Sequence, residues 1–327
     1  MQENNNSKTV LQAIKEGNGK TISVEVEPPV LGIGRKAVFE LLDPLVELGI
    51  SYVDITYHAQ RIVRYGTDGS PVLETLKPGT VGIAGAILER YRDAGVFPVP
   101  HVICTSFNQD DTQQYLADLH YLGVHNVLAL RGDPQKNENG KFIEFKPVEG
   151  GHAYAKDLVR QIANLRKGIY VGATGDTIDF CIGAACFPEG NSGFLLDQEV
   201  EWLKAKIYAG ANYFVTQMFF NPEAYARLVD TAAKAGINVD EIRIVPGLKP
   251  ITTAKQLEIL PKFFKCSFPA YLIEGMEKNR GNQQASREFG IDKCVELCER
   301  LRVYGAPSLH FYASRDAPVR EVIQGLK

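Results

Sequence analysis

The chain alternates strand-like and helix-like segments along almost its whole length, and this alternation most limits the folds it can adopt. Amphipathic stretches, including 35–48 and 81–94, separate short apolar segments typical of buried strands. Those segments lie at 22–27, 52–56, 99–104, 126–130, 180–186, 213–217, 242–246 and 308–312. Such a series predicts an α/β protein with a parallel sheet, which a barrel closes most simply. We expect a single-domain (β/α)8 TIM barrel over 21–327, preceded by an N-terminal extension or helix at 1–20; a doubly wound open sheet is the alternative.

Composition excludes several classes of protein. Hydrophobic residues at 45% and charged residues at 23% are ordinary globular values, and the net charge of −3 predicts no nucleic-acid partner and no anionic membrane surface. The apolar runs are too short to span a membrane, and the polar stretch 1–6 does not resemble a secretory signal, so we expect a cytoplasmic protein. Six cysteines without CxxC spacing predict reduced thiols, and Cys294 and Cys298 predict helix packing and no metal site.

The glycine-rich segments do not match the common nucleotide-binding motifs. Residues 32–35 and 172–175 lack the full GxGxxG spacing between a strand and a helix, and no GxxxxGK[ST] loop is present. A nucleotide cofactor, if the protein binds one, must therefore be held by another architecture.

Charged residues directly follow the predicted strand at 126–130. Arg131-Gly132-Asp133 lies where the carboxyl end of a strand would open onto a ligand site in a barrel. Taken alone, the triplet is more typical of a helix cap with a surface ion pair. The irregular segment 134–151 comes next, and its length favours a lid over a simple insertion.

Other predicted strands also end in polar residues. In the segment 23–29, the period of two places Val24 and Val26 on one face and Glu25 on the other, which would face the barrel interior. Burial there should raise the pKa of Glu25 and suit it to general-acid chemistry, although an acid paired with an interior cation is the alternative. His101 alone would be a structural histidine, and the Gln217 amide alone is weak evidence. Together with the Arg-Gly-Asp segment they predict a site on one rim.

Nine segments, in order, resemble the flavin-dependent 5,10-methylenetetrahydrofolate reductases. They are SVEVEPP at 23–29, DITYHA at 54–59, PHVIC at 100–104, NVLALRGD at 126–133, YAKDLV at 154–159, CFPEG at 186–190, KIYAGANYFVTQMFF at 206–220, PGLKP at 246–250 and LHFY at 309–312. The resemblance implies a (β/α)8 barrel that binds FAD across the strand ends, with NADH or NADPH and the folate using the same face in turn.

The resemblance also implies roles for individual residues. Glu25 takes the general-acid position, and Asp133 the position of an aspartate that acts electrostatically near the flavin and pterin. Gln217, Gln256 and Arg315 correspond to substrate contacts, with Arg315 one residue out of register. The cofactor positions are Thr56, Tyr57, Ala59, His101, Leu130, Arg131, Gly132, Asp133, Ala155, Phe187, Asn191, Glu199 and Lys206. The chain departs from the family pattern at Phe187, which lacks a hydroxyl, and at Asn191, which carries no charge.

The expected activity is the FAD-dependent reduction of 5,10-methylenetetrahydrofolate to 5-methyltetrahydrofolate by NAD(P)H, with hydride passing through the flavin in a ping-pong sequence. That reaction would serve one-carbon and methionine metabolism. Small molecules are the expected partners, and a barrel of this size is expected to form a homo-oligomer. The departures around 187–205 keep open a second hypothesis, a flavin- or folate-binding partner subunit with little nicotinamide activity of its own.

Overall fold

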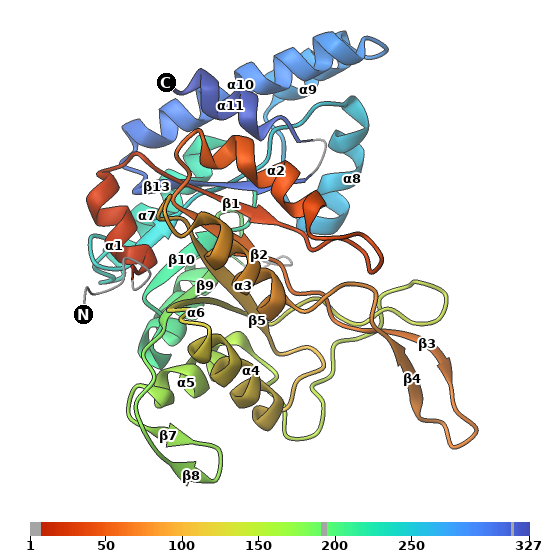
Figure 1. The fold of residues 1–327 in the computed structure, drawn as a ribbon. Helices are drawn as coiled ribbons and strands as arrows, with labels where there is room; N and C mark the ends of the chain where they lie inside the picture. Colours follow the sequence, from red (N-terminus) through yellow and green to blue (C-terminus); the bar gives the residue numbers. More distant parts are fainter. Residues whose placement is uncertain (1–7, 191–194, 315–316) are drawn as a thin grey trace.

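The computed structural model describes residues 8–190, 195–314 and 317–327, and these form a barrel of parallel strands wrapped by helices (Figure 1). The barrel strands are β1 (Thr21–Val26), β2 (Tyr52–Ile55), β5 (Phe97–Ile103), β6 (Asn126–Leu130), β9 (Cys181–Cys186), β10 (Tyr213–Thr216), β11 (Arg243–Val245), β12 (Gly247–Leu248) and β13 (Ser308–Ala313). Their order is β11-β10-β9-β6-β5-β2-β1-β13-β12, and every pair is parallel. The predicted (β/α)8 barrel is confirmed.

One predicted strand is split where the barrel closes. The segment expected at 242–246 forms β11, which pairs with β10, and then β12, which pairs with β13. Pro246 lies between them and has no N–H to donate to a sheet. Its carbonyl instead accepts a hydrogen bond from the His310 N–H at 3.1 Å. The two short strands together join the ends of the sheet.

The helices follow the strands and cover the outside of the barrel (Figure 1). In α5, for example, Leu158, Val159, Ile162 and Leu165 repeat at helical spacing and are all buried. Cys294 and Cys298 are buried free thiols on α10, which confirms the prediction of helix packing. The helices are α2 (Lys36–Val46), α3 (Thr80–Tyr91), α4 (Gln109–Tyr121), α5 (Ala155–Leu165), α6 (Leu196–Ala209), α7 (Pro222–Lys234), α8 (Ala254–Phe264), α9 (Ala270–Lys278), α10 (Gln283–Val303) and α11 (Val319–Gly325).

A short N-terminal helix, α1 (Val10–Gly17), packs against the amino-terminal end of the barrel. Its buried face, which includes Val10 and Ile14, joins an interior apolar cluster with Tyr52, Phe97 and Leu128. The side chain of Asn126, the first residue of β6, accepts a hydrogen bond from the Val10 N–H at 2.8 Å and donates one to the Lys8 carbonyl at 3.0 Å. Apolar side chains therefore fill the half of the barrel interior at the amino-terminal ends of the strands.

Two hairpins that the sequence did not predict extend from the barrel. The first, β3 (Arg61–Tyr65) with β4 (Pro71–Glu74), projects well beyond it; the second is β7 (Ile169–Tyr170) with β8 (Ala173–Thr174) (Figure 1). The segment 134–151 docks on the first hairpin, since the Ile62 N–H donates to the Lys136 carbonyl at 3.1 Å. No helix among the described residues is long and apolar enough to cross a membrane.

Candidate active site

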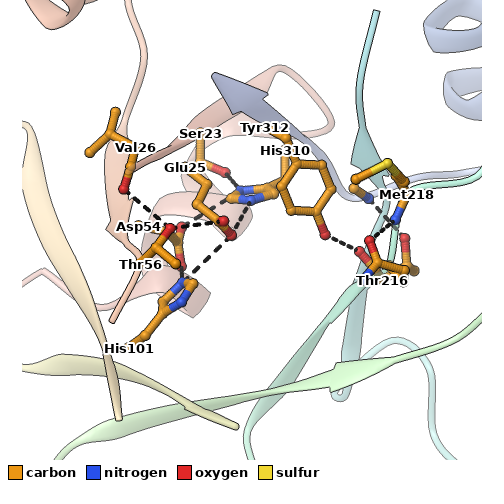
Figure 2. Close-up of polar contacts among 12 residues, drawn as sticks. Ser23, Glu25, Val26, Asp54, Thr56, His101, Thr216, Met218, His310 and Tyr312 are labelled. Carbon is orange, nitrogen blue, oxygen red and sulfur yellow. Dashed lines mark hydrogen bonds and ion pairs between the residues drawn. The ribbon is translucent and has the colours of Figure 1, made fainter. Parts of the chain in front are cut away.

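Polar side chains from β1, β2, β5 and β13 meet inside the barrel, toward the carboxyl ends of the strands (Figure 2). The alternation of the strands produces this arrangement, because Val24 and Val26 pack outward against the helices while Glu25 points inward. The predicted inward orientation of Glu25 is therefore confirmed. Its side chain keeps 19% of its surface exposed, whereas those of His101 and His310 are almost completely buried.

Glu25 lies within reach of two imidazoles. Its Oε2 is 3.7 Å from His101 Nε2 and 3.8 Å from His310 Nε2, and its Oε1 accepts a hydrogen bond from the Thr56 hydroxyl at 3.0 Å. Burial acts to raise the pKa of Glu25, but His101, His310 and the Thr56 hydroxyl together outweigh burial and lower it. The expectation of a raised pKa was wrong, because it considered burial without the imidazoles on neighbouring strands. The alternative of an acid paired with an interior cation fits Glu25 beside His101, whose pKa is raised.

The Arg-Gly-Asp turn follows β6 and is held by Thr105. Its one hydroxyl hydrogen is shared between the carbonyls of Arg131 and Asp133, whose oxygens lie 3.1 and 2.9 Å from the hydroxyl oxygen. Gly132 has a φ of +81°, and a Cβ there would lie 2.6 Å from the Thr105 hydroxyl oxygen. A side chain at position 132 would therefore disturb both carbonyl contacts.

Arg131 and Asp133 are exposed directly after the carboxyl end of β6, the position that the sequence predicted for them. The Arg131 guanidinium lies 5.1 Å from the centre of the Phe145 ring, so the segment 134–151 folds back over this turn. Among the described residues no ion pair joins Arg131 to Asp133, and the simple surface ion pair is not found. Leu130, the last residue of β6, is partly buried beside the turn.

The residues predicted after β2 lie beside this rim. Tyr57 packs edge-on against Phe107 and Tyr115, with ring centres 5.2 and 5.9 Å apart, and Ala59 is partly buried. The Tyr115 hydroxyl donates to the His101 carbonyl at 3.1 Å. This aromatic group fixes the ends of β2 and β5 relative to each other.

Glu199 and Lys206 form a buried pair on α6. The Glu199 side chain is fully buried and its Oε1 lies 3.9 Å from Lys206 Nζ, which also donates to the Ala185 carbonyl at 2.6 Å. Burial raises the pKa of Glu199 to about 7 and lowers the pKa of Lys206, although each partner opposes that shift. In this conformation the pair faces protein, and Glu199 has no surface open to a cofactor.

The other predicted residues differ in their placement. The Gln217 side-chain oxygen accepts a hydrogen bond from the Met218 N–H at 2.8 Å, on the partly buried strand end of β10. The Gln256 oxygen accepts from the backbone N–H groups of Thr252 and Thr253 and completes the capping box that begins α8, a structural role that the sequence did not predict. Ala155 is the first residue of α5, and Phe187 is partly buried just after β9. The predicted contacts Asn191 and Arg315 lie outside the described residues.

Three residues of the site lie within the motifs of the sequence but were assigned no role there. Asp54 and His310 lie in the interior cluster beside Glu25. Lys249 directly follows β12, and burial lowers its pKa while Glu25 and Glu27 act to raise it. The same alternation that placed Glu25 inward places Asp54 and His310 inward on their own strands.

Comparison with known proteins identifies a family for the chain. The family model described as methylenetetrahydrofolate reductase matches residues 10–326. The chain is 30% identical over 313 residues to methylenetetrahydrofolate reductase (NADH) 1 of Arabidopsis thaliana, covering 92% of this chain and 47% of the relative. It is 26% identical over 323 residues to 5,10-methylenetetrahydrofolate reductase of Pectobacterium carotovorum subsp. carotovorum, covering 98% and 94%. The chain thus spans about half the length of its plant relative and almost all of the bacterial one.

A solved structure shares the fold. An uncharacterized protein from Clostridium thermocellum that binds two copies of 5-methyl-5,6,7,8-tetrahydrofolic acid superposes with a TM-score of 0.55 and 15% identity, over 97% of this chain and 98% of that one. At that identity the likeness concerns the barrel alone. With the family model matched from residue 10 to residue 326, this chain belongs to the methylenetetrahydrofolate reductase family.

Proposed function

We propose that this protein reduces 5,10-methylenetetrahydrofolate to 5-methyltetrahydrofolate, with FAD as the bound hydride carrier and NADH or NADPH as the donor. The observation that carries the proposal is Glu25, an acid on the barrel interior at the carboxyl end of β1, next to His101 in a chain of this family. Relatives carry both NADH and NADPH in their names, so either donor is compatible with the family.

The rim offers features that suit a dinucleotide cofactor. Arg131 presents an exposed guanidinium, a group that pairs well with phosphate oxygens, and Gly132 presents backbone without a side chain. The N-cap residue of α5, Tyr154, makes no side-chain capping bond, so the first turn with Ala155 leaves N–H groups for an anion. Arg131 and this helix end would hold the pyrophosphate, and Thr56 and His101 would hold the ring system. When bound, FAD would take hydride from the nicotinamide and deliver it to the folate.

The protein's own residues would manage protons and charge. Glu25 would pass a proton to the folate nitrogen that leaves as the five-membered ring opens, which creates a cationic carbon centre. Asp133, an exposed carboxylate at the end of β6, would stabilise that cation before hydride arrives. Gln217 would orient the folate or nicotinamide with its amide.

Two half-reactions test this proposal. The purified protein should show a flavin spectrum, bleach anaerobically with NADH or NADPH, and regain its colour when methylenetetrahydrofolate is added. Failure to bleach would exclude a self-sufficient reductase. Bleaching without reoxidation by the folate would exclude the substrate.

A matched pair of variants tests the role of Glu25. Glu25→Gln should leave bleaching by the nicotinamide nearly intact and slow reoxidation by the folate about 10²- to 10⁴-fold, since only the second half-reaction consumes the proton. The control is Glu27→Gln, two residues further on and exposed, where the carboxylate contacts His58 and Lys77. Equal losses in both half-reactions for Glu25→Gln would contradict the general-acid role.

The buried Glu199–Lys206 pair supports a second candidate function. Because Glu199 is closed off in the segment that departs from the family pattern, a partner subunit that binds flavin or folate but reacts poorly with nicotinamide is the alternative. A flavoprotein that bleaches with dithionite and reoxidises with the folate, yet ignores both nicotinamides, would favour this alternative.

A further inference from the structure

Asp54 carries a carboxyl group in the interior of the barrel, beside Glu25 on the neighbouring strand (Figure 2). It alternates on β2 with Val53 and Ile55, which pack outward. Its side chain is 0% exposed, and among the described residues neither of its oxygens has a hydrogen-bond partner. Burying a carboxyl group without a hydrogen-bond partner is unfavourable, so the polar groups that face Asp54 matter to its role.

The groups around Asp54 come from five strands. Its Oδ1 lies 3.7 Å from His101 Nε2, and its Oδ2 lies 3.6 Å from His310 Nδ1, which also contacts the Ser23 hydroxyl at 2.9 Å. Tyr52 and Tyr213 face it with phenols whose pKa burial raises, as does Tyr312, so these groups stay neutral. The remaining charged groups of this cluster are Glu25 above the imidazoles and Lys249 just after β12.

His101 lies between the two carboxylates. Its Nε2 is 3.7 Å from Glu25 Oε2 and 3.7 Å from Asp54 Oδ1. These separations are too long for hydrogen bonds but short enough for strong attraction between charges in a dry interior. Burial acts to lower the pKa of His101, and the two carboxylates outweigh it and raise the pKa.

We infer that Asp54 is a positioning residue that keeps a proton on His101 beside Glu25, so that an ionised Glu25 is reprotonated from within the site during folate reduction. This inference rests on the proposed function. In the step, the proton leaves His101 Nε2 for Glu25 and then forms an N–H bond on the folate nitrogen as the C–N bond of the five-membered ring breaks. The bound cofactor would supply the hydride that converts the freed carbon to a methyl group, and solvent would return a proton to His101. The lowered pKa of Glu25 is then compatible with its role as the final donor.

Titration of the histidines by NMR tests the charge coupling without any substrate. The chain has six histidines, and His101→Asn identifies the signal of His101. In the unmutated protein that signal should titrate above the ordinary value of 6.5. Asp54→Asn should lower its midpoint by about 1 to 3 pH units, the usual effect of one nearby opposite charge. Asp43→Asn removes a surface carboxylate paired with Arg90 and should leave the midpoint unchanged.

The folate half-reaction supplies the second readout. In Asp54→Asn, bleaching by the nicotinamide should persist, while reoxidation by the folate should fall at least tenfold at about pH 7.5 and recover at lower pH. A neutral His101 at about pH 7 in the unmutated protein would overturn the inference whether or not the variant folds. A shifted titration with an unchanged pH profile would overturn the proton supply. If the His101 titrations are as expected but the protein never reduces folate, the proposed function is refuted and the coupling of His101 to Asp54 stands.

Discussion

Replacing Gly132 by alanine should damage the turn after β6 more than its backbone angle alone explains. A φ of +81° costs an L-residue about 1 to 2 kcal/mol. The new Cβ would also lie 2.6 Å from the Thr105 hydroxyl oxygen and 3.1 Å from Ile103 Cβ. Moving Thr105 away sacrifices the hydrogen bond that its one hydroxyl hydrogen shares between two carbonyls, about 0.5 to 1.5 kcal/mol. We therefore expect Gly132→Ala to lower the free energy of unfolding by about 1.5 to 3.5 kcal/mol.

Two control variants separate these contributions. Gly123 has a φ of +79° and open space where a Cβ would lie, so Gly123→Ala should cost only the backbone part, about 1 to 2 kcal/mol. Thr105→Val removes the hydroxyl without adding a side chain at 132 and should cost only the shared hydrogen bond, about 0.5 to 1.5 kcal/mol. Urea unfolding gives all three values, and the flavin content of each purified variant reports on the rim. If Gly132→Ala were no worse than Gly123→Ala, the argument from Thr105 would fail.

Three further changes have defined outcomes. Asn126→Ala removes two hydrogen bonds to the segment that begins α1 and should lower the free energy of unfolding by about 1 to 3 kcal/mol in urea. Burial raises the pKa of Glu199 from 4.5 to about 7. Its contribution to folding stability is therefore fully present below pH 4.5 and is lost as the pH rises through 7. Glu199→Gln, which cannot ionise, should gain stability relative to the unmutated protein by up to about 3 kcal/mol between pH 5 and 8, and a constant difference would refute this. Phe145→Ala removes the ring beside Arg131 and should weaken flavin binding about 2- to 30-fold in a fluorescence titration, with unchanged affinity as the contrary result.

The sequence predicted the barrel well because its signals are local. Apolar runs of strand length, amphipathic stretches between them and polar strand ends are all readable within a few residues. The hairpin β3–β4 escaped prediction because its strands are only five and four residues long, and the hydrophobic core clusters of the described residues include none of their side chains. The split at Pro246 does have a local signal, since proline cannot donate within a sheet, but only barrel closure shows that the chain changes partner strands there.

The site was predicted in part for the same reason. The period of two placed Glu25 inward, but the direction of its pKa depends on His101 and His310, which are 76 and 285 residues away in the chain (101 − 25 and 310 − 25). Applied to the segments 52–56 and 308–312, the same period would have placed Asp54 and His310 inward as well. Which of these side chains touch is determined by barrel closure and cannot be read from one strand.

The order of the side-chain layers along the barrel axis determines how protons can reach the site. Below the polar cluster, Tyr52, Phe97 and Leu128 pack with α1 into a continuous apolar layer at the amino-terminal end. Of the four titratable groups Glu25, Asp54, His101 and His310, only Glu25 keeps an appreciable exposed fraction, 19%, at the rim. A proton held on one of the buried groups of the cluster therefore reaches solvent or substrate by passing the Glu25 carboxylate. Glu25 thus links the buried imidazoles to the face on which the folate would bind, and the imidazoles and the Thr56 hydroxyl lower its pKa.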